Sequence, residues 1–398
     1  MAIVAADTAW VLISSALVLF MLPGLALFYG GLVRRKNVLS SMMHSFVVMA
    51  LVAILWVVIG YSLAFGEGNW FVGGLEHFCL QGIDYTSVSG TIPTYVFIAF
   101  QGMFAIITPA LISGALVGRI KFKSYLAFIA LWSLIVYAPV CHWVWGGGFL
   151  TGEALDFAGG TVVHITSGIS ALAILVFLGK RKGYGIDVIK PHNITLTLLG
   201  IGLLWFGWFG FNAGSALAAD EIAGLAFMTT FVAPAAAGLS WMTVEWISTG
   251  KPTALGFATG ILAGLVAVTP AAGFVTPMAA ILIGLIAGVV CYWAVVIVKG
   301  KLGYDDSLDV FGVHGVGGIT GALLTGVFAT VGGAGLLLGN AHQLFIQFEG
   351  IVITILYAAI CTIIIGFVID RTLGLKVTES EENIGLDQTQ HGEAGYNF

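Results

Sequence analysis

Charged residues are scarce in this chain. Only 9% of its 398 residues are Asp, Glu, Lys or Arg, against about 25% in an ordinary soluble domain. The net charge is −5, and Lys and Arg gather only in short connections, which excludes the basic surface that nucleic-acid binding requires. Hydrophobic residues make up 59% of the sequence, and the mean hydropathy is +1.03. This composition predicts a protein with many helices embedded in a lipid bilayer.

Motifs that bind metals or cofactors are missing from the sequence. The four cysteines lie far apart, in the pattern of neither a disulfide framework nor a zinc site. No histidine belongs to an HExxH or similar set, and no nucleophile elbow, phosphate loop or dinucleotide fingerprint is present. We therefore predict no metal, no cofactor and no enzymatic activity. No basic stretch precedes the first apolar run, so no secretory signal peptide is expected.

Apolar runs of about 20 residues, the length of a helix that crosses a bilayer, recur along the chain. The eleven predicted spans are 8–30, 41–65, 93–117, 123–145, 160–179, 194–215, 222–247, 254–270, 275–298, 310–331 and 345–369. The fifteen Lys and Arg residues fall in or beside the connections that follow the odd-numbered spans, whereas the other connections carry acids but no Lys or Arg. By the positive-inside rule, this alternation places the N-terminus outside and the C-terminus in the cytoplasm.

A Val-His motif occurs twice, 150 positions apart (314 − 164). Each copy is followed, four residues after the histidine, by Gly-Ile and then by Ser or Thr. An ionisable side chain in an apolar span is costly unless it faces a cavity or a partner. We therefore interpret His164 and His314 as pore-lining residues. The lone histidines His44 and His142, which have no repeated context, are interpreted as hydrogen-bonded packing.

The two copies lie on the fifth and tenth predicted spans, which divides ten spans into two sets of five. Because five is odd, the two sets, about 8–179 and 194–331, must be inserted in opposite orientations, the inverted-repeat plan of many transporters. The eleventh span, about 345–369, is an addition. The predicted fold is an all-α integral membrane protein with a membrane domain at 1–375 and a cytoplasmic tail at 376–398. The tail is polar and acidic, which favours a solvated end over a docked one.

Aromatic residues gather at the predicted outer ends of three spans. Phe100 and Phe104 share one helix face, Trp145 ends the fourth span, and Phe211 and Ser215 lie at the end of the sixth. Two interpretations are open: a belt of aromatic residues at the membrane interface, or a site whose ring faces attract a small cation.

One acid precedes each histidine motif. Asp156 lies eight residues before His164, and Asp309 lies five residues before His314. An acid just before a helix commonly caps its N-terminus. We prefer that role for both acids over direct contact with a substrate.

These segments together resemble the ammonium transporter (Amt/Mep/Rh) family, on its bacterial and archaeal Amt side. The resemblance covers essentially the whole chain, with the motifs in the family's order. They are LFYGGLV (27–33), FQGMF (100–104), WGGG (145–148), DFAGGTVVH (156–164), GFNAGS (210–215), DVFGVHG (309–315) and, in the tail, Gly385-Leu386-Asp387 followed by His391-Gly392-Glu393.

The resemblance implies a homotrimer in the cell membrane, with one narrow pore in each subunit that carries ammonium or methylammonium. It also implies that a PII-type signalling protein docks at the cytoplasmic face. The implied site residues are, for recruitment of the substrate, Trp145, Ser215 and Phe104; for the gate, Phe104, Phe211 and Phe100; in the pore, His164 and His314; and in support, Asp156 and Asp309.

The predicted pore suits ammonia better than ammonium. A bare cation in a medium of low dielectric constant costs tens of kcal/mol, so a buried one tends to lose a proton. We expect capture of NH4+, deprotonation and passage of NH3, with or without a separately moved proton. A straight residue count, however, puts the two histidines on the order of 10 Å apart in depth. The alternatives are a gas or neutral-solute channel of the Rh type, a membrane sensor that signals through its tail, and an intramembrane enzyme.

Overall fold

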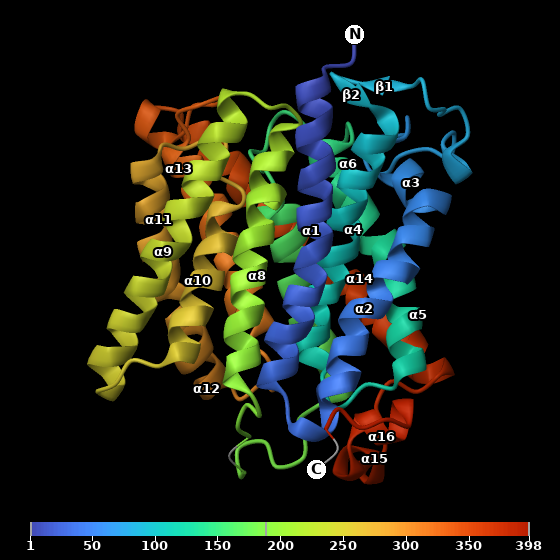
Figure 1. The fold of residues 1–398 in the computed structure, drawn as a ribbon, viewed down its shortest axis with the longest axis vertical. Helices are drawn as coiled ribbons and strands as arrows, with labels where there is room; N and C mark the ends of the chain where they lie inside the picture. The colour runs from blue at the N-terminus through green and yellow to red at the C-terminus, as the bar shows by residue number, and fades with distance from the viewer. Residues whose placement is uncertain (1, 188, 397–398) are drawn as a thin grey trace.

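Long apolar helices run side by side along the long axis of the molecule (Figure 1). The computed structural model describes residues 2–187 and 189–396. Within this part of the chain, ten helical segments are long and apolar enough to cross a membrane, and α10 (Ala254–Val268) is a shorter apolar helix. Counting α10, these segments coincide with the eleven predicted spans. The chain is therefore a multi-pass membrane protein.

The first half of the chain supplies five spans, and turns of π-helix extend or begin three of them. The segments are α1 (Ala5–Leu32); α2 (Val38–Leu55), Trp56–Gly60 and α3 (Tyr61–Phe65); α4 (Thr94–Leu116); α5 (Phe122–Trp132), Ser133–Tyr137 and α6 (Ala138–Trp145); and Gly160–Ile165 with α7 (Thr166–Leu178). A short hairpin, β1 (Val88–Ser89) and β2 (Ile92–Pro93), pairs antiparallel before α4.

The second half repeats this plan, and one long helix follows it. The segments are α8 (Ile194–Ala213); α9 (Glu221–Thr249); α10; α11 (Pro277–Tyr292), Trp293–Val298 and α12 (Lys299–Leu302); Phe311–Gly315 with α13 (Val316–Phe328); and α14 (Ala341–Thr372). Single turns of 3-10 helix lie at Arg35–Asn37, Phe78–Leu80, Gly214–Ala216 and Leu336–Leu338.

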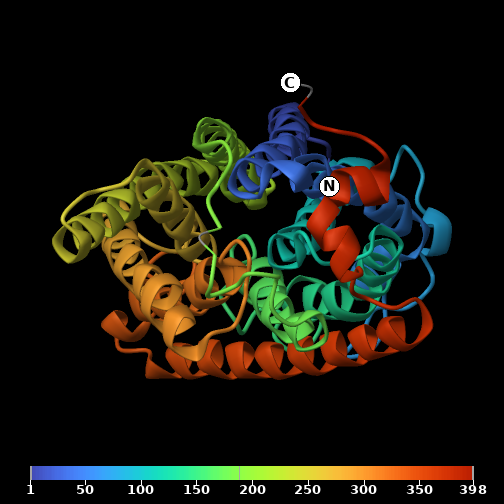
Figure 2. The same cartoon turned by 90° about the horizontal axis from the view of Figure 1, so that it is seen from below.

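The additional helix α14 holds the two halves together. Seen from below, it lies along one side of the molecule and passes both halves (Figure 2). The Gln347 amide on α14 donates to the carbonyl of Leu155 in the first half (2.8 Å) and to that of Ala322 in the second (3.1 Å). Its own carbonyl oxygen accepts from the Leu155 N–H at 2.7 Å.

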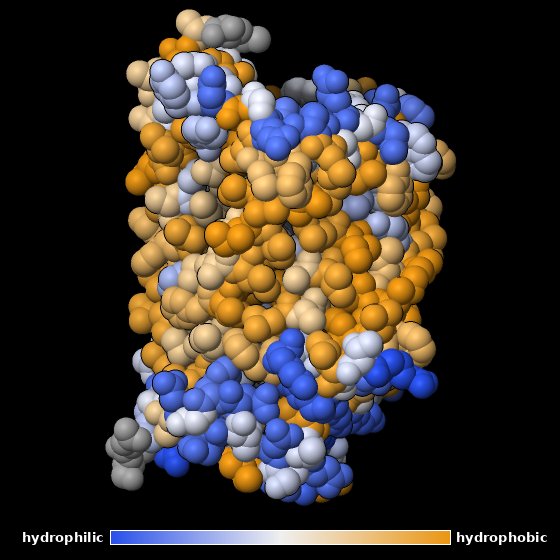
Figure 3. All heavy atoms as spheres, turned by 90° about the vertical axis from the view of Figure 1, so that its right-hand side faces the viewer, coloured by the Kyte–Doolittle hydropathy of each residue, from blue (hydrophilic) through white to orange (hydrophobic). Residues whose placement is uncertain are grey.

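The two ends of the chain lie on opposite faces of the helical body. The N-terminus and the hairpin lie at one face, which we call the N-terminal face, and the last helices lie at the other, the C-terminal face (Figure 1). Between them, one side of the molecule carries a broad apolar band, and polar residues gather above and below it (Figure 3). An odd number of spans requires termini on opposite sides, so this arrangement agrees with the count.

The tail corrects an expectation from composition. Its helices α15 (Glu379–Ile384) and α16 (Leu386–His391) pack against the C-terminal face instead of standing free in solvent. Leu386 is fully buried, and its N–H donates to the Asn37 side chain at 2.9 Å. The Asp387 carboxylate accepts from the Ser40 N–H at 2.8 Å and so caps the start of α2. Composition could not reveal these contacts, because they join segments almost 350 residues apart in the chain.

Candidate functional site

The two repeated histidines meet in the centre of the protein. His164 lies in the π-helical turn Gly160–Ile165 and His314 in the turn Phe311–Gly315, and each is only 1% exposed. Their Nδ1 atoms are 3.2 Å apart. A neutral imidazole carries one N–H, so one ring must donate through Nδ1 while the other accepts there. Within the described chain, Nε2 of His164 is buried and has no hydrogen-bond partner.

A close crossing of the two helices brings the histidines together. A Cβ atom added at Gly168 would lie 2.2 Å from the backbone nitrogen of Gly315. One added at Gly318 would lie 3.0 Å from the carbonyl oxygen of Gly160 and 3.1 Å from Cβ of His164. Each glycine follows its histidine by four residues, so each helix crosses the other one turn after its histidine. The residue count therefore overestimates how far apart in depth the two histidines lie. It fails because both helices begin within the protein and are offset toward each other.

Asp156 caps the first histidine-bearing helix, as the sequence predicts. Its carboxylate accepts four main-chain N–H groups at 2.6–3.1 Å, those of Gly159, Gly160, Thr161 and Val162. The carboxyl side chain is buried, and burial raises its pKa, against the effect of the four donors. The carbonyl oxygen of Asp156 also accepts from the indole N–H of Trp145 at 2.9 Å.

The capping prediction for Asp309 is wrong, because Asp306 holds that position. Asp306 accepts the N–H of Phe311 at 2.7 Å. Asp309 adopts a left-handed backbone conformation (φ 62°) and pairs with Lys299, whose Nζ lies 2.6 Å from its Oδ1. The sequence holds a signal for the correct assignment: Asp306 precedes His314 by eight residues (314 − 306), as Asp156 precedes His164 (164 − 156).

Aromatic rings lead from the N-terminal face toward the histidines. The half-buried Trp145 meets the buried Phe104 edge to face, with ring centres 5.8 Å apart. Phe104 contacts Phe100 at 5.1 Å and Phe211 at 4.3 Å, and Phe211 stacks on His164 at 6.2 Å. The Ser215 hydroxyl donates to the Phe211 carbonyl at 2.9 Å. The structure therefore brings all five predicted aromatic-site residues into one column.

The column ends in a small cavity beside the histidines. The cavity has a volume of about 10 Å³, enough for one water-sized molecule, and its lining is apolar apart from the two histidines and Trp208. Trp208 stacks on His164 with ring centres 5.5 Å apart, and its indole N–H donates to the Thr269 hydroxyl at 2.9 Å. Nothing in the sequence distinguishes Trp208 from its aromatic neighbours.

A larger cavity opens toward the C-terminal face. We call it the vestibule; it has a volume of about 380 Å³, and its lining includes Leu262, Val313, Lys299, Asp309, Arg181 and Tyr184. Leu262 also lines the histidine cavity, and Val313 directly precedes His314. The two cavities are therefore neighbours, with Leu262 in the lining of both. The sequence does not place this vestibule, and it does not distinguish Lys299 from the other basic residues of the connections.

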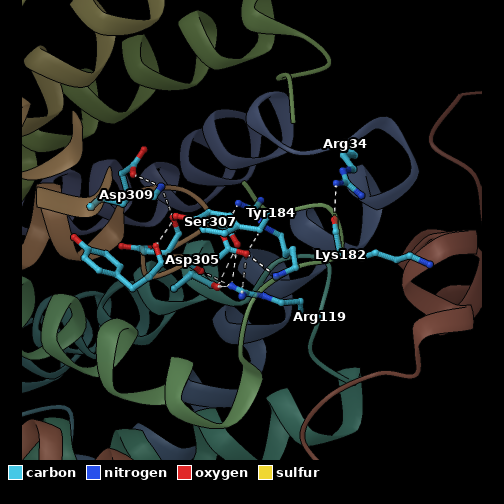
Figure 4. Close-up of polar contacts among 12 residues, drawn as sticks. Arg34, Arg119, Lys182, Tyr184, Asp305, Ser307 and Asp309 are labelled. Atoms are coloured by element: carbon cyan, nitrogen blue, oxygen red, sulfur yellow. Dashed lines mark hydrogen bonds and ion pairs between the residues drawn. The ribbon is translucent and has the colours of Figure 1, made fainter. Parts of the chain in front are cut away.

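A buried charge cluster lies beside the vestibule and joins the two halves (Figure 4). Arg119, which follows α4, pairs with Asp305 at 3.2 Å, and Arg181, which follows α7, pairs with the same carboxylate at 2.6 Å. Burial alone raises the pKa of Asp305, but hydrogen bonds from Arg181 and the charge of Arg119 bring it below its usual range. Burial also lowers the pKa of Arg119 to about 10. Asp305, in the second half, is therefore the shared counter-ion of two arginines from the first half.

Hydrogen-bonded packing is the prediction for the lone histidines His142 and His44, and the structure confirms it for the first but not for the second. His142 contacts the carbonyl oxygens of Ala64 (3.0 Å) and Asn69 (2.8 Å), as hydrogen-bonded packing predicts. For His44 the interpretation is wrong, since neither ring nitrogen has a hydrogen-bond partner within the described residues. Its ring is buried instead by aromatic contact with Tyr125, at 4.2 Å between centres. Within residues 2–187 and 189–396, no group of three His, Cys, Asp or Glu side chains is placed to hold a metal ion.

Comparison with known proteins covers nearly the whole chain. Residues 9–396 match the model of a family described as the Ammonium Transporter Family. An ammonium transporter of Aquifex aeolicus is 53% identical over 98% of this chain and 93% of its own length, and the ammonium transporter Amt1 of Archaeoglobus fulgidus is 45% identical over 98% and 99%. Among solved structures, Mep2 of Candida albicans has a TM-score of 0.89 at 36% identity, covering 95% of this chain and 88% of its own. A protein described as a sensor Amt protein has a TM-score of 0.90 at 30% identity, covering 97% and 98%.

Proposed function

Since the chain belongs to the ammonium transporter family, we propose that it binds NH4+ at its N-terminal face, removes a proton and conducts NH3 past the paired histidines. The proton is released outside or moves separately. Methylammonium, which has the same charged head and one added methyl group, is a second substrate. The column of aromatic rings that leads to two hydrogen-bonded imidazoles is the observation that carries this proposal.

Trp145, Phe104 and Ser215 form the recruitment site in this proposal. The half-buried indole and the phenyl ring offer faces that attract a cation, an interaction worth up to about 2 kcal/mol when the cation is partly desolvated. The serine hydroxyl offers an oxygen acceptor for an N–H of the ammonium ion. The main chain of Asp156 holds the indole in place through its carbonyl.

Phe104 and Phe211, with Phe100 beside them, form the gate. Their rings are in contact and buried, so they must move for a molecule to pass. An ion that loses its water there meets no fixed charge, and this favours loss of a proton over entry as a cation. Potassium ion has no proton to lose and is rejected.

His164 and His314 then supply hydrogen bonds to NH3 where it has lost water. The small, otherwise apolar cavity fits a molecule of this size. Asp156 and Asp306 act indirectly, because they cap the two helices that hold the histidines. Asp309 has no contact with the histidine cavity, and we place it at the pore exit. We assign no catalytic residue.

The protein acts as a homotrimer in the cell membrane, with the N-terminal face outside and the C-terminal face in the cytoplasm. The placement of Lys and Arg supports this orientation. A PII-type signalling protein is the proposed partner at the C-terminal face, where it would cover the vestibules.

The central test replaces one histidine and measures transport and stability on the same preparation. In His314→Ala, ammonium-induced currents in proteoliposomes should fall steeply, while the melting temperature should change little. A merely structural pair would behave in the opposite way, because leaving His164 without its partner should cost about 1–3 kcal/mol of stability. Retained current with a lowered melting temperature would therefore overturn the pore assignment.

A further inference from the structure

The vestibule contains an ammonium group that belongs to the chain itself. The Nζ atom of Lys299 donates to Oδ1 of Asp309 and to the main-chain carbonyl of Asp306, each at 2.6 Å. Its side chain is only 16% exposed. A lysine head group and methylammonium have the same charge and the same three N–H donors. The contacts of Lys299 are therefore those that a small ammonium ion would make at this position.

This group lies at the exit of the path through the histidines. Lys299 and Asp309 line the vestibule together with Leu262, which also lines the histidine cavity, and Val313, which directly precedes His314. A molecule that leaves the histidines toward the C-terminal face therefore enters the space beside Lys299.

The acceptors at this position outnumber those that Lys299 uses. Oδ1 of Asp306 is buried and has no hydrogen-bond partner among the described residues, while Oδ2 holds the N–H of Phe311. The Asp306 carbonyl and the Asp309 carboxylate hold the cationic head, and the Asp306 carboxylate acts on it electrostatically without a direct contact. Charged and neutral oxygens of this kind bind monovalent cations.

We propose that Asp306 and Asp309 form a cation site at the pore exit, suited to NH4+ or methylammonium, and that Lys299 occupies it permanently. NH3 that reaches the vestibule takes a proton from water, leaving hydroxide in the solvent, and becomes NH4+ again. An unpaired carboxylate there would attract and retain that ion. By filling the site, Lys299 prevents retention of the product. This inference rests on the proposed function only in taking the vestibule as the exit.

The test removes the lysine charge and asks whether the site then accepts an ion. Lys299→Met keeps the length of the side chain and leaves Asp309 without a counter-ion. Lys301→Met is the matched control, since Lys301 is exposed on the same helix α12. A third variant, Lys299→Met with Asp309→Asn, removes both charges. If Lys299→Met does not fold, Lys299→Gln replaces it, because its amide can still donate to the Asp306 carbonyl.

Melting temperatures are measured in detergent with ammonium, methylammonium or choline chloride at one ionic strength. Relative to choline, ammonium and methylammonium should raise the melting temperature of Lys299→Met by about 1–3 °C more than that of the parent. Lys301→Met should behave as the parent, and the double variant should lose the gain. No additional gain in Lys299→Met, or an equal gain in the double variant, overturns the proposal.

A second experiment measures how strongly ammonium loaded inside proteoliposomes inhibits the inward current. It should reduce the inward current of Lys299→Met more strongly than that of the parent or of Lys301→Met, and equal reduction in all three contradicts the inference. A parent protein that carries no ammonium-induced current would refute the proposed function, whereas the melting experiment would still decide the cation site. The two failures are thus distinguishable.

Discussion

At the scale of the residue, the buried Asp306 has several roles in the structure. It caps the second histidine-bearing helix, contributes its carbonyl oxygen to the contacts of Lys299, and has one oxygen without a partner. Burial raises the pKa of its carboxyl to about 6, because the charged form is poorly solvated. Ionisation of this group therefore occurs at a cost to the folded protein.

This cost makes stability depend on pH in a defined direction. The folded protein binds the Asp306 proton more tightly than the unfolded chain does, so the stabilisation is fully present below about pH 4 and is lost as the pH rises through about 6. A shift of about two pKa units corresponds to about 3 kcal/mol. Asp306→Asn keeps an acceptor for Phe311 but does not titrate. We expect the melting temperature of the parent to fall relative to this variant between pH 4 and 7. The exposed Asp84→Asn is the control, and a difference that stays constant with pH would contradict the expectation.

Trp145 gives a second test at the scale of the residue. Trp145→Leu removes the ring face and the indole N–H but keeps an apolar side chain. If cation–π attraction captures ammonium, the concentration that gives half-maximal current should rise about 10-fold. Trp70→Leu, at an exposed tryptophan in the connection before β1, should leave that concentration unchanged. An unaltered concentration dependence in Trp145→Leu would exclude the recruitment role.

At the scale of the element, the two histidine-bearing helices depend on glycine at their crossing. Gly168 and Gly318 each lie one turn after a histidine and against the backbone of the other half. Backbone atoms cannot move aside as a flexible side chain can. The separation of the histidines is thus set by the absence of two Cβ atoms.

Gly168→Ala should separate the helices and destabilise the protein by about 1–3 kcal/mol or more. The added methyl group would lie 2.4 Å from Cα of Gly315. Ammonium-induced current should fall together with the melting temperature, which distinguishes this variant from His314→Ala. Gly202→Ala on α8 is the control, because nothing lies within 4 Å of its added Cβ. An equally small effect of both substitutions would show that the crossing is not tightly packed.

The sequence predicts the features that depend on local composition, and it does not predict those that depend on tertiary contacts. The spans are predictable because every membrane helix must be apolar over about 20 residues. The repeated context of His164 and His314 predicts that both line a pore, but a residue count places them on the order of 10 Å apart in depth. Their contact at 3.2 Å depends on the close crossing of the two helices, which the sequence does not reveal. The capping prediction for Asp309 fails although the helix begins directly after it, because Asp309 adopts a left-handed backbone conformation and pairs with Lys299. The cap comes instead from Asp306, three residues earlier in the chain. The Lys299 contact and the docking of Asp387 depend on tertiary structure and leave no periodic pattern.

At the scale of the whole molecule, separate contacts join the two repeats and the tail into one body. Gln347 on α14 binds both halves, and Asp305 of the second half pairs with Arg119 and Arg181 of the first. The tail adds a further link, because Asp387 caps α2. The C-terminal face is therefore an ordered surface, of the kind that a protein partner requires.

A PII-type protein should bind this face and stop conduction. Pull-downs with ATP, ADP and 2-oxoglutarate, alone and combined, should show binding to the parent in at least one condition. Lys182→Glu, at an exposed residue beside the tail, should weaken binding, whereas Glu76→Gln at the opposite face should not. Lack of binding in every condition would remove this partner for the chain.

The crossing of the two histidine-bearing helices also bears on how turnover is achieved. Because the halves are in backbone contact at the centre of the path, they cannot swing past one another as independent lobes. Rocking between outward-open and inward-open states, as in many carriers built from inverted repeats, would break that contact in every cycle. Passage must instead proceed through small ring movements in an otherwise stationary body, so the flux should depend only weakly on temperature, as diffusion through a narrow channel does.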